Sequence, residues 1–167
     1  MDIVLIDLNE ELVDTWKEHF AGCDDVDIIC DDYFTVPADA LVSPANSEGF
    51  MDGGLDEAIR NVLGYDVEAK VQEKYPDGFL PVGQAVAISL DHPDYDWLIS
   101  APTMERPEYV GDTNNAYLAF RAILKCADEI GAERLVCCGL ATWTGRMLPD
   151  ECAYQMKEAY VEHNGQS

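Results

Sequence analysis

The chain has 167 residues, 48% of them hydrophobic, which is enough for one folded domain with a buried core. Its 33 acidic and 10 basic residues give a formal net charge of −23, a field that repels duplex DNA and RNA. No apolar run approaches the roughly 20 residues that span a bilayer, and the first residues lack the positive segment of a secretion signal. We therefore expect a soluble cytoplasmic protein without membrane contact or direct duplex binding, whose oligomeric state the composition leaves open.

Apolar runs and helical patterns alternate along the chain, with no internal repeat or linker between them. Asn9 is suited to cap the first helix, Gly64 to end the second, Gly131 to end the fourth and Pro149 to open the last. Strands separated by helices of this length predict an α/β domain with a largely parallel sheet. The predicted strands are residues 3–6, 26–30, 40–43, 84–90, 97–101 and 135–138, and the predicted helices are 9–20, 56–63, 67–75, 113–130 and 149–161.

Six cysteines occur without a CxxC pair, and the three histidines lie far from them in the sequence. This spacing gives poor support to a zinc site. We expect no metal and no cofactor, and we expect reduced thiols that are mostly buried, as in a cytosolic protein.

Two loops, at residues 43–56 and 139–149, each follow a predicted strand and lead into a predicted helix. In such sheets ligands bind beyond the carboxyl ends of the strands. In the first loop Gly53 and Gly54 precede a helix, where main-chain N–H groups can approach a pyrophosphate closely. Glycines at this place also serve simple turns, and an acid such as Asp56 also favours a helix N-terminus through the helix dipole.

The segment from Asp32 to Asn46, which ends in Leu-Val-Ser-Pro-Ala-Asn, and the following Gly53-Gly54-Leu55-Asp56 resemble the signature of macrodomains. In that family a strand ends in an Asn-Ala-Ala-Asn-like motif, and a glycine-rich turn leads into a helix that carries an acid. The resemblance covers roughly residues 26–161. It implies a single domain, residues 1–167, folded as a three-layer α/β/α sandwich with a mixed, largely parallel sheet. It also implies that ADP-ribose, or a related nucleotide, lies in a cleft between the two loops.

The resemblance further implies roles for single residues. Asp32 would accept a hydrogen bond from the adenine amino group, Tyr33 would lie beside the base, and Asn46 would face the distal ribose. Asp56 would orient or deprotonate a water at the anomeric carbon, but Arg60 stands where hydrolases of the family often have a histidine. Asp32 and Asn46 could instead have a purely structural role, in which their side chains stabilise a turn. The implied ligand-binding residues are Asp32, Tyr33, Ala45, Asn46, Gly53, Gly54, Leu55, Ala141, Thr142, Trp143, Thr144, Gly145 and Arg146, with Asn46 and Asp56 as the catalytic candidates.

The second loop departs from the family pattern, which is rich in glycine so that consecutive N–H groups wrap the pyrophosphate. Ala141, Trp143 and Arg146 stand where glycines are usual, and a Cβ disfavours positive φ. Either Arg146 reaches the pyrophosphate and also balances Asp52, or Trp143 and Arg146 close the cleft. Three functions stay open: a hydrolase of ADP-ribosyl adducts or ADP-ribose 1''-phosphate, a non-catalytic reader of ADP-ribosylated macromolecules, and a macrodomain fold with a different nucleotide or none.

Overall fold

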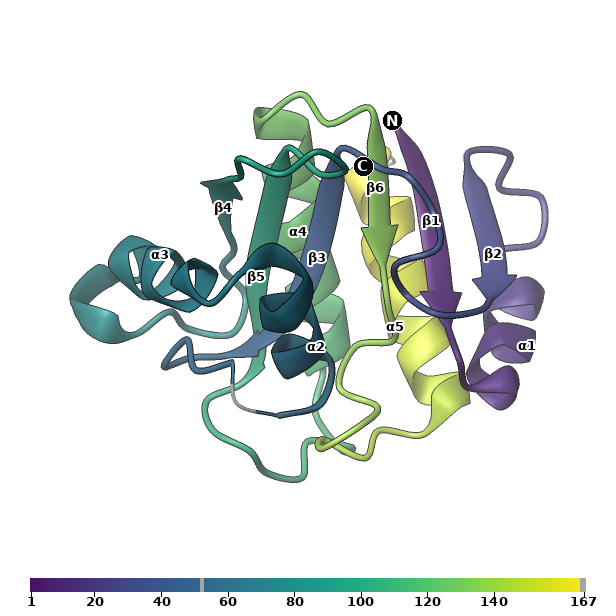
Figure 1. Cartoon of the computed structure of the whole chain (residues 1–167). Helices are drawn as coiled ribbons and strands as arrows, with labels where there is room; N and C mark the ends of the chain where they lie inside the picture. Colours follow the sequence, from purple (N-terminus) through teal and green to yellow (C-terminus); the bar gives the residue numbers. More distant parts are fainter. Residues whose placement is uncertain (52, 166–167) are drawn as a thin grey trace.

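Six strands form one sheet in the computed structural model, which describes residues 1–51 and 53–165 (Figure 1). All neighbouring strands are parallel except the pair at one edge, residues 86–89 and 97–104, which is antiparallel. The predicted mixed, largely parallel sheet is therefore confirmed. In order across the sheet the strands are β2 (Val26–Cys30), β1 (Asp2–Asp7), β6 (Arg134–Cys137), β3 (Ala40–Asn46), β5 (Trp97–Met104) and β4 (Val86–Ser89).

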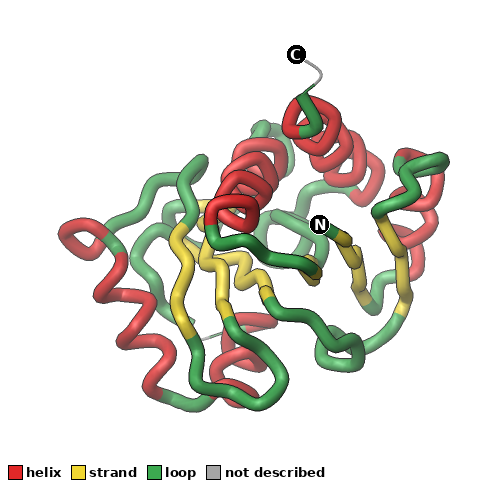
Figure 2. The backbone as a smooth tube through the Cα atoms, turned by 90° about the horizontal axis from the view of Figure 1, so that it is seen from above, coloured by secondary structure: helices red, strands yellow, loops and turns green. Residues whose placement is uncertain are grey.

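Helices cover both faces of the sheet, which gives the three-layer α/β/α arrangement (Figure 2). On one face lie α1 (Glu10–His19), α4 (Asn115–Glu129) and α5 (Pro149–His163), and on the other lie α2 (Gly54–Leu63), α3 (Asp66–Lys74) and the short 3₁₀ turn η1 (Pro76–Gly78). Asn9 caps α1 as predicted, because its Oδ1 accepts hydrogen bonds from the N–H groups of Glu11 and Leu12 at 3.1 and 3.4 Å. Pro149 opens α5, and Gly64 ends α2 with a φ of +108°.

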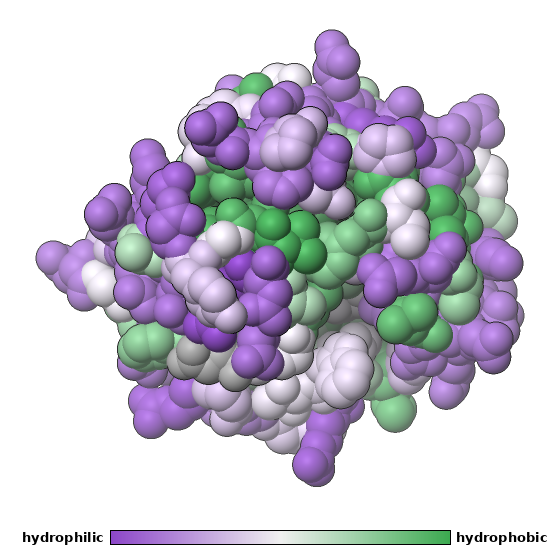
Figure 3. Space-filling model, in the orientation of Figure 1, coloured by the Kyte–Doolittle hydropathy of each residue, from purple (hydrophilic) through white to green (hydrophobic). Residues whose placement is uncertain are grey.

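The central strands are buried on both faces because helices cover both sides of a parallel sheet. Val4 of β1, Leu41 of β3 and Val136 of β6 have no exposed surface, and Phe120 of α4 is equally buried. Hydrophilic side chains cover much of the surface around these layers, apart from a hollow with apolar and neutral walls (Figure 3). Among the described residues, no helix combines the length and the apolar composition that a membrane span requires.

β3 and β5 run further than the sequence predicts, through Asn46 and Met104. The prediction ends β3 at Ser43, before a proline, and prolines are rare inside central strands because they lack the N–H donor. In the structure Pro44 stays in register with Ala101, and the register shifts only between Ala45 and Asn46. The longer strand places Asn46 at the carboxyl edge of the sheet, while Met1 and the end of α5 lie at the opposite edge (Figure 1).

Candidate functional site

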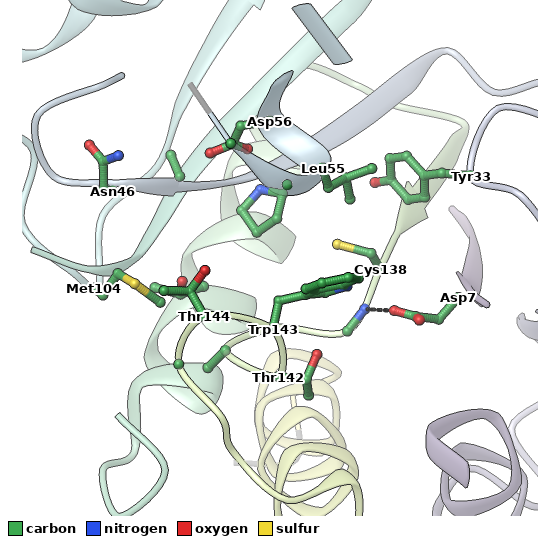
Figure 4. A pocket seen from close by; sticks show the side chains of 18 of the residues that line it. Asp7, Tyr33, Asn46, Leu55, Asp56, Met104, Cys138, Thr142, Trp143 and Thr144 are labelled. Atoms are coloured by element: carbon green, nitrogen blue, oxygen red, sulfur yellow. Dashed lines mark hydrogen bonds between the residues drawn. The ribbon is translucent and has the colours of Figure 1, made fainter. Parts of the chain in front are cut away.

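A cavity of about 790 Å³ lies beyond the carboxyl ends of β1, β3 and β6, between the two loops (Figure 4). Its position agrees with the rule for ligand sites in parallel sheets. All of the predicted site residues line it except Asp32 and Arg146: Tyr33, Ala45, Asn46, Gly53, Gly54, Leu55, Asp56, Ala141, Thr142, Trp143, Thr144 and Gly145.

The end of β1 forms a wall of this cavity that the sequence does not indicate. Asp7, Leu8 and Asn9 all line it. The two carboxylate oxygens of Asp7 accept hydrogen bonds from the N–H groups of Asn9 and Gly139 at 3.0 and 3.1 Å (Figure 4). A Cβ on Gly139 would come within 2.3 Å of the Leu12 side chain and 3.1 Å of Asp7, so a larger residue here would displace these side chains. Asp7 therefore joins the first strand to the second loop.

Asp31, and not Asp32, reaches the cavity. Asp32 is exposed, and its Oδ1 accepts a hydrogen bond from the N–H of Phe34 at 3.0 Å, so its side chain takes the alternative of a turn residue. Tyr33 is buried, and its hydroxyl lies 2.7 Å from the carbonyl oxygen of Val42, to which it donates. Burial raises the pKa of that hydroxyl well above its ordinary value. Tyr33 thus presents a fixed ring and not a free hydroxyl.

Asn46 borders the cavity while it also holds the first loop. Its Oδ1 accepts hydrogen bonds from the N–H groups of Glu48 and Phe50 at 3.0 and 3.3 Å, and its Nδ2 donates to the carbonyl of Phe50 at 3.1 Å. The side-chain amide has two N–H donors, so one can still serve a ligand. The turn role and the ligand role are therefore compatible at Asn46.

Asp56 is a buried carboxyl group at the start of α2. Burial raises its pKa to about 7, and the hydroxyl of Ser43 opposes this shift by donating to Oδ1 at 2.7 Å. A carboxyl group that titrates near neutral pH can accept a proton from water or return one. Arg60 stands where, by the resemblance described above, hydrolases of the family often have a histidine. It does not line the cavity, and it pairs with Glu68 on α3 at 3.5 Å.

Two residues of the second loop that are not glycine have the left-handed conformation that favours glycine. Ala141 and Arg146 have φ values of +66° and +56°. Main-chain hydrogen bonds hold this turn, from Met147 to the carbonyl of Ala141 at 2.9 Å and from Val110 to that of Gly145 at 2.9 Å. Each left-handed residue costs about 1 kcal/mol. These hydrogen bonds thus hold Ala141 and Arg146 in the left-handed conformation, which lowers the stability of the folded protein.

The two accounts of the second loop concern the places of Arg146 and Trp143. Arg146 is exposed and does not line the cavity, and Asp52, its expected counter-charge, lies outside the described residues. Trp143 lines the cavity and is 77% exposed, and in the view of Figure 4 its ring lies between Cys138 and Thr144.

The ionisable Asp, Glu, Lys, Arg and His side chains of the described cavity lining are all acidic. Asp7, Asp31, Glu48 and Asp56 line the cavity, and no Lys, Arg or His belongs to the described lining. Among the described residues, no group of three His, Cys, Asp or Glu side chains is arranged to hold a metal ion. An anionic ligand in this cavity would have to be held by main-chain N–H groups and uncharged polar side chains.

Comparison with known proteins agrees with this architecture. The family model described as Macro domain matches residues 42–156, and the chain belongs to this family. An uncharacterized protein of Aquifex aeolicus (strain VF5) is 32% identical over 134 residues, which are 80% of this chain and 79% of that protein.

Two solved structures share the fold. The macrodomain of Mycobacterium tuberculosis DarG superposes with a TM-score of 0.69 at 14% identity, over 79% of this chain and 87% of that one. Thermosipho africanus DarTG in complex with ADP-ribose superposes with a TM-score of 0.67 at 18% identity, over 79% of this chain and 37% of that one. These structures show that the chain shares the macrodomain fold.

Proposed function

We propose that this protein binds ADP-ribose, either free or as an ADP-ribosyl group on another molecule, in the cavity between its two loops. The observation that carries the proposal is the continuity of the cavity. It extends from Asp31 and Tyr33, after β2, to Asn46, at the end of β3, and Asp56, in the first turn of α2. Its volume of about 790 Å³ is within the range of roughly 300–1,000 Å³ that ligand pockets occupy. The related DarTG structure, solved with ADP-ribose, supports the same ligand.

In this proposal the adenosine lies beside Asp31 and Tyr33, and the distal ribose lies beside Asn46 and Asp56. The diphosphate between them passes the start of α2, where the N-cap residue Gly53 offers no side-chain cap to the first N–H groups. These N–H groups, and those of the second loop, would bind the phosphates without a basic side chain.

Calorimetry with ADP-ribose tests the proposal, with AMP and ADP as shorter ligands and with salt at about 0.1 and about 1 M. We expect saturable heat and a rise in Tm with ADP-ribose. No heat and no change in Tm at millimolar ligand, in either salt, would refute ADP-ribose binding. Saturation by another nucleotide in the same assay would instead support a diverged ligand.

A second candidate function is hydrolysis of an ADP-ribosyl bond or of ADP-ribose 1''-phosphate. It is favoured by one observation, the buried carboxyl of Asp56 with a pKa of about 7. In this role Asp56 would take the proton of a water that attacks the anomeric carbon, and Asn46 would hold the ribose. Without this chemistry the same cavity would serve as a reader of ADP-ribosyl groups.

Release of ADP-ribose from modified protein, and of phosphate from ADP-ribose 1''-phosphate, distinguishes hydrolase from reader. Asp56→Asn keeps the shape of the side chain but removes the base, so we expect about a hundredfold loss or more. Glu73→Gln, at an exposed position of α3, is the matched control. Unchanged turnover in Asp56→Asn and Asn46→Ala would refute this assignment, and absence of turnover in the wild type would favour the reader.

A further inference from the structure

The carboxylate of Glu68 on α3 joins the first loop to α2. Its Oε2 accepts a hydrogen bond from the main-chain N–H of Met51 at 2.6 Å, and its Oε1 lies 3.5 Å from Nη1 of Arg60. Both charged side chains are largely shielded, with exposed fractions of 23% for Glu68 and 15% for Arg60. A short hydrogen bond to a shielded carboxylate is stronger than one between neutral groups.

Arg60 fixes this carboxylate from the side of α2. Its guanidinium also lies 3.9 Å from Glu57 and stacks over the ring of Tyr65, with 5.2 Å between Cζ and the ring centroid. The planar guanidinium can hold several such partners in one arrangement, which the ammonium group of lysine cannot. Arg60 therefore directs Glu68 toward Met51.

Glu68 holds the main chain at Met51, two residues before Gly53 in the sequence. Upstream, the side chain of Asn46 fixes the loop as far as Phe50. Downstream, Gly53 and Gly54 line the cavity, and an added Cβ at either would find no atom within 4 Å. No side chain of the described residues packs around the glycine turn at these positions, so the attachment of the flanking residues contributes to holding it in place.

We propose that Glu68 is a positioning residue for the ligand site, which sets the Gly53–Gly54 turn against the phosphates and distal ribose through the Met51 N–H. This inference rests on the proposed binding of ADP-ribose. It gives Arg60 a task in the site, as the residue that fixes Glu68, without any contact to the ligand.

Three variants test the proposal: Glu68→Ala, Glu68→Gln and Glu73→Ala, the last at an exposed position of the same helix. Glu68→Ala removes the acceptor, so we expect ADP-ribose to bind about tenfold more weakly. AMP lacks the distal ribose and the second phosphate, and its affinity should change less than about twofold. Glu68→Gln keeps an amide oxygen that can accept from Met51 and should restore most of the affinity, while Glu73→Ala should match the wild type.

Hydrogen exchange of the Met51 amide gives a readout that needs no ligand. In the free protein this exchange should be faster in Glu68→Ala than in the wild type and unchanged in Glu73→Ala. An unchanged ADP-ribose affinity in folded Glu68→Ala, or an equal loss for AMP and ADP-ribose, would overturn the positioning role. Failure of the wild type to bind ADP-ribose would refute the proposed function itself, and the amide exchange would then decide alone whether Glu68 holds the turn.

Discussion

The hydroxyl of Ser43 donates to Oδ1 of Asp56 across 2.7 Å, and both residues are buried where β3 faces the start of α2. Ser100 is in register with Ser43 on β5, and its hydroxyl lies 2.7 Å from that of Tyr75. Residues in register on neighbouring strands present their side chains on the same face of a sheet. Asp56 therefore lies at the wall of the cavity next to a buried polar patch, and its burial there raises its pKa.

Because the pKa of Asp56 is raised in the folded state, this residue should make the wild-type protein less stable as the pH rises. The folded protein holds the proton up to about pH 7, whereas the ordinary pKa is 3.8, so between these values the folded state binds more protons than the unfolded state. The free energy of unfolding then falls as pH rises through this window, by at most about 4 kcal/mol. Asp56→Asn, which cannot ionise, should lose this decrease and be the more stable protein at pH 8.

Urea unfolding of both proteins at pH 5 and pH 8, in high salt to screen the other carboxylates, measures the effect. The difference between variant and wild type isolates Asp56 from the rest of the 33 acidic residues. Equal dependence on pH in the two proteins would contradict the assigned pKa.

Arg146→Gly should stabilise the protein. Arg146 is exposed and has a φ of +56°, a conformation that glycine adopts without steric strain. Relief of this strain exceeds the entropic penalty of glycine, so we expect a gain of up to about 1 kcal/mol in the free energy of unfolding. Thr144→Gly, at an exposed position of the same loop without positive φ, should be neutral or destabilising. The reverse ranking of the two variants in thermal unfolding would refute the strain.

Trp143 should report ligand binding by its fluorescence. Trp16 is fully buried and Trp97 is partly buried, whereas Trp143 is 77% exposed and lines the cavity. A ligand that enters the cavity changes the solvent around this indole, so ADP-ribose should shift or quench the emission. The signal should disappear in Trp143→Phe while calorimetry still detects binding. A signal that persists in this variant would place the responding tryptophan elsewhere.

Salt should strengthen the binding of ADP-ribose, which is the opposite of its effect on proteins with basic phosphate sites. The diphosphate approaches a chain of net charge −23 and a cavity whose described lining has carboxylates but no basic side chain. Raising salt from about 0.1 to about 1 M shortens the screening length from roughly 10 to 3 Å and weakens this repulsion. Adenosine, which is uncharged, serves as the control for the effect of salt on the protein. Affinity for ADP-ribose that falls with salt relative to adenosine would reveal a cationic phosphate contact.

The sequence is informative where a signal lies within a few neighbouring residues. The cap at Asn9, the opening of α5 at Pro149 and the order of strands and helices are confirmed because each depends on local pattern. Asn46 and Asp56 could be proposed for the cavity from the resemblance to macrodomains, and both line it.

Other features depend on contacts between distant segments and could not be predicted. Asp7 reaches Gly139 because β1 neighbours β6, an order that apolar runs do not encode. The pairing of Arg60 with Glu68 depends on how α2 and α3 pack. The positive φ of Ala141 runs against the preference of alanine, and it occurs in a turn held by main-chain hydrogen bonds between non-adjacent residues.

The placement of the two ends of the chain has a practical consequence for measurement. Met1 and the end of α5 lie at the edge of the sheet opposite the cavity (Figure 1). A tether at either of these places would therefore hold the molecule on a sensor surface with the opening of the cavity toward the solution. The same geometry would let a fluorescent protein be fused at either end without blocking access, so this domain could be converted into an immobilised detector for whatever its cavity retains.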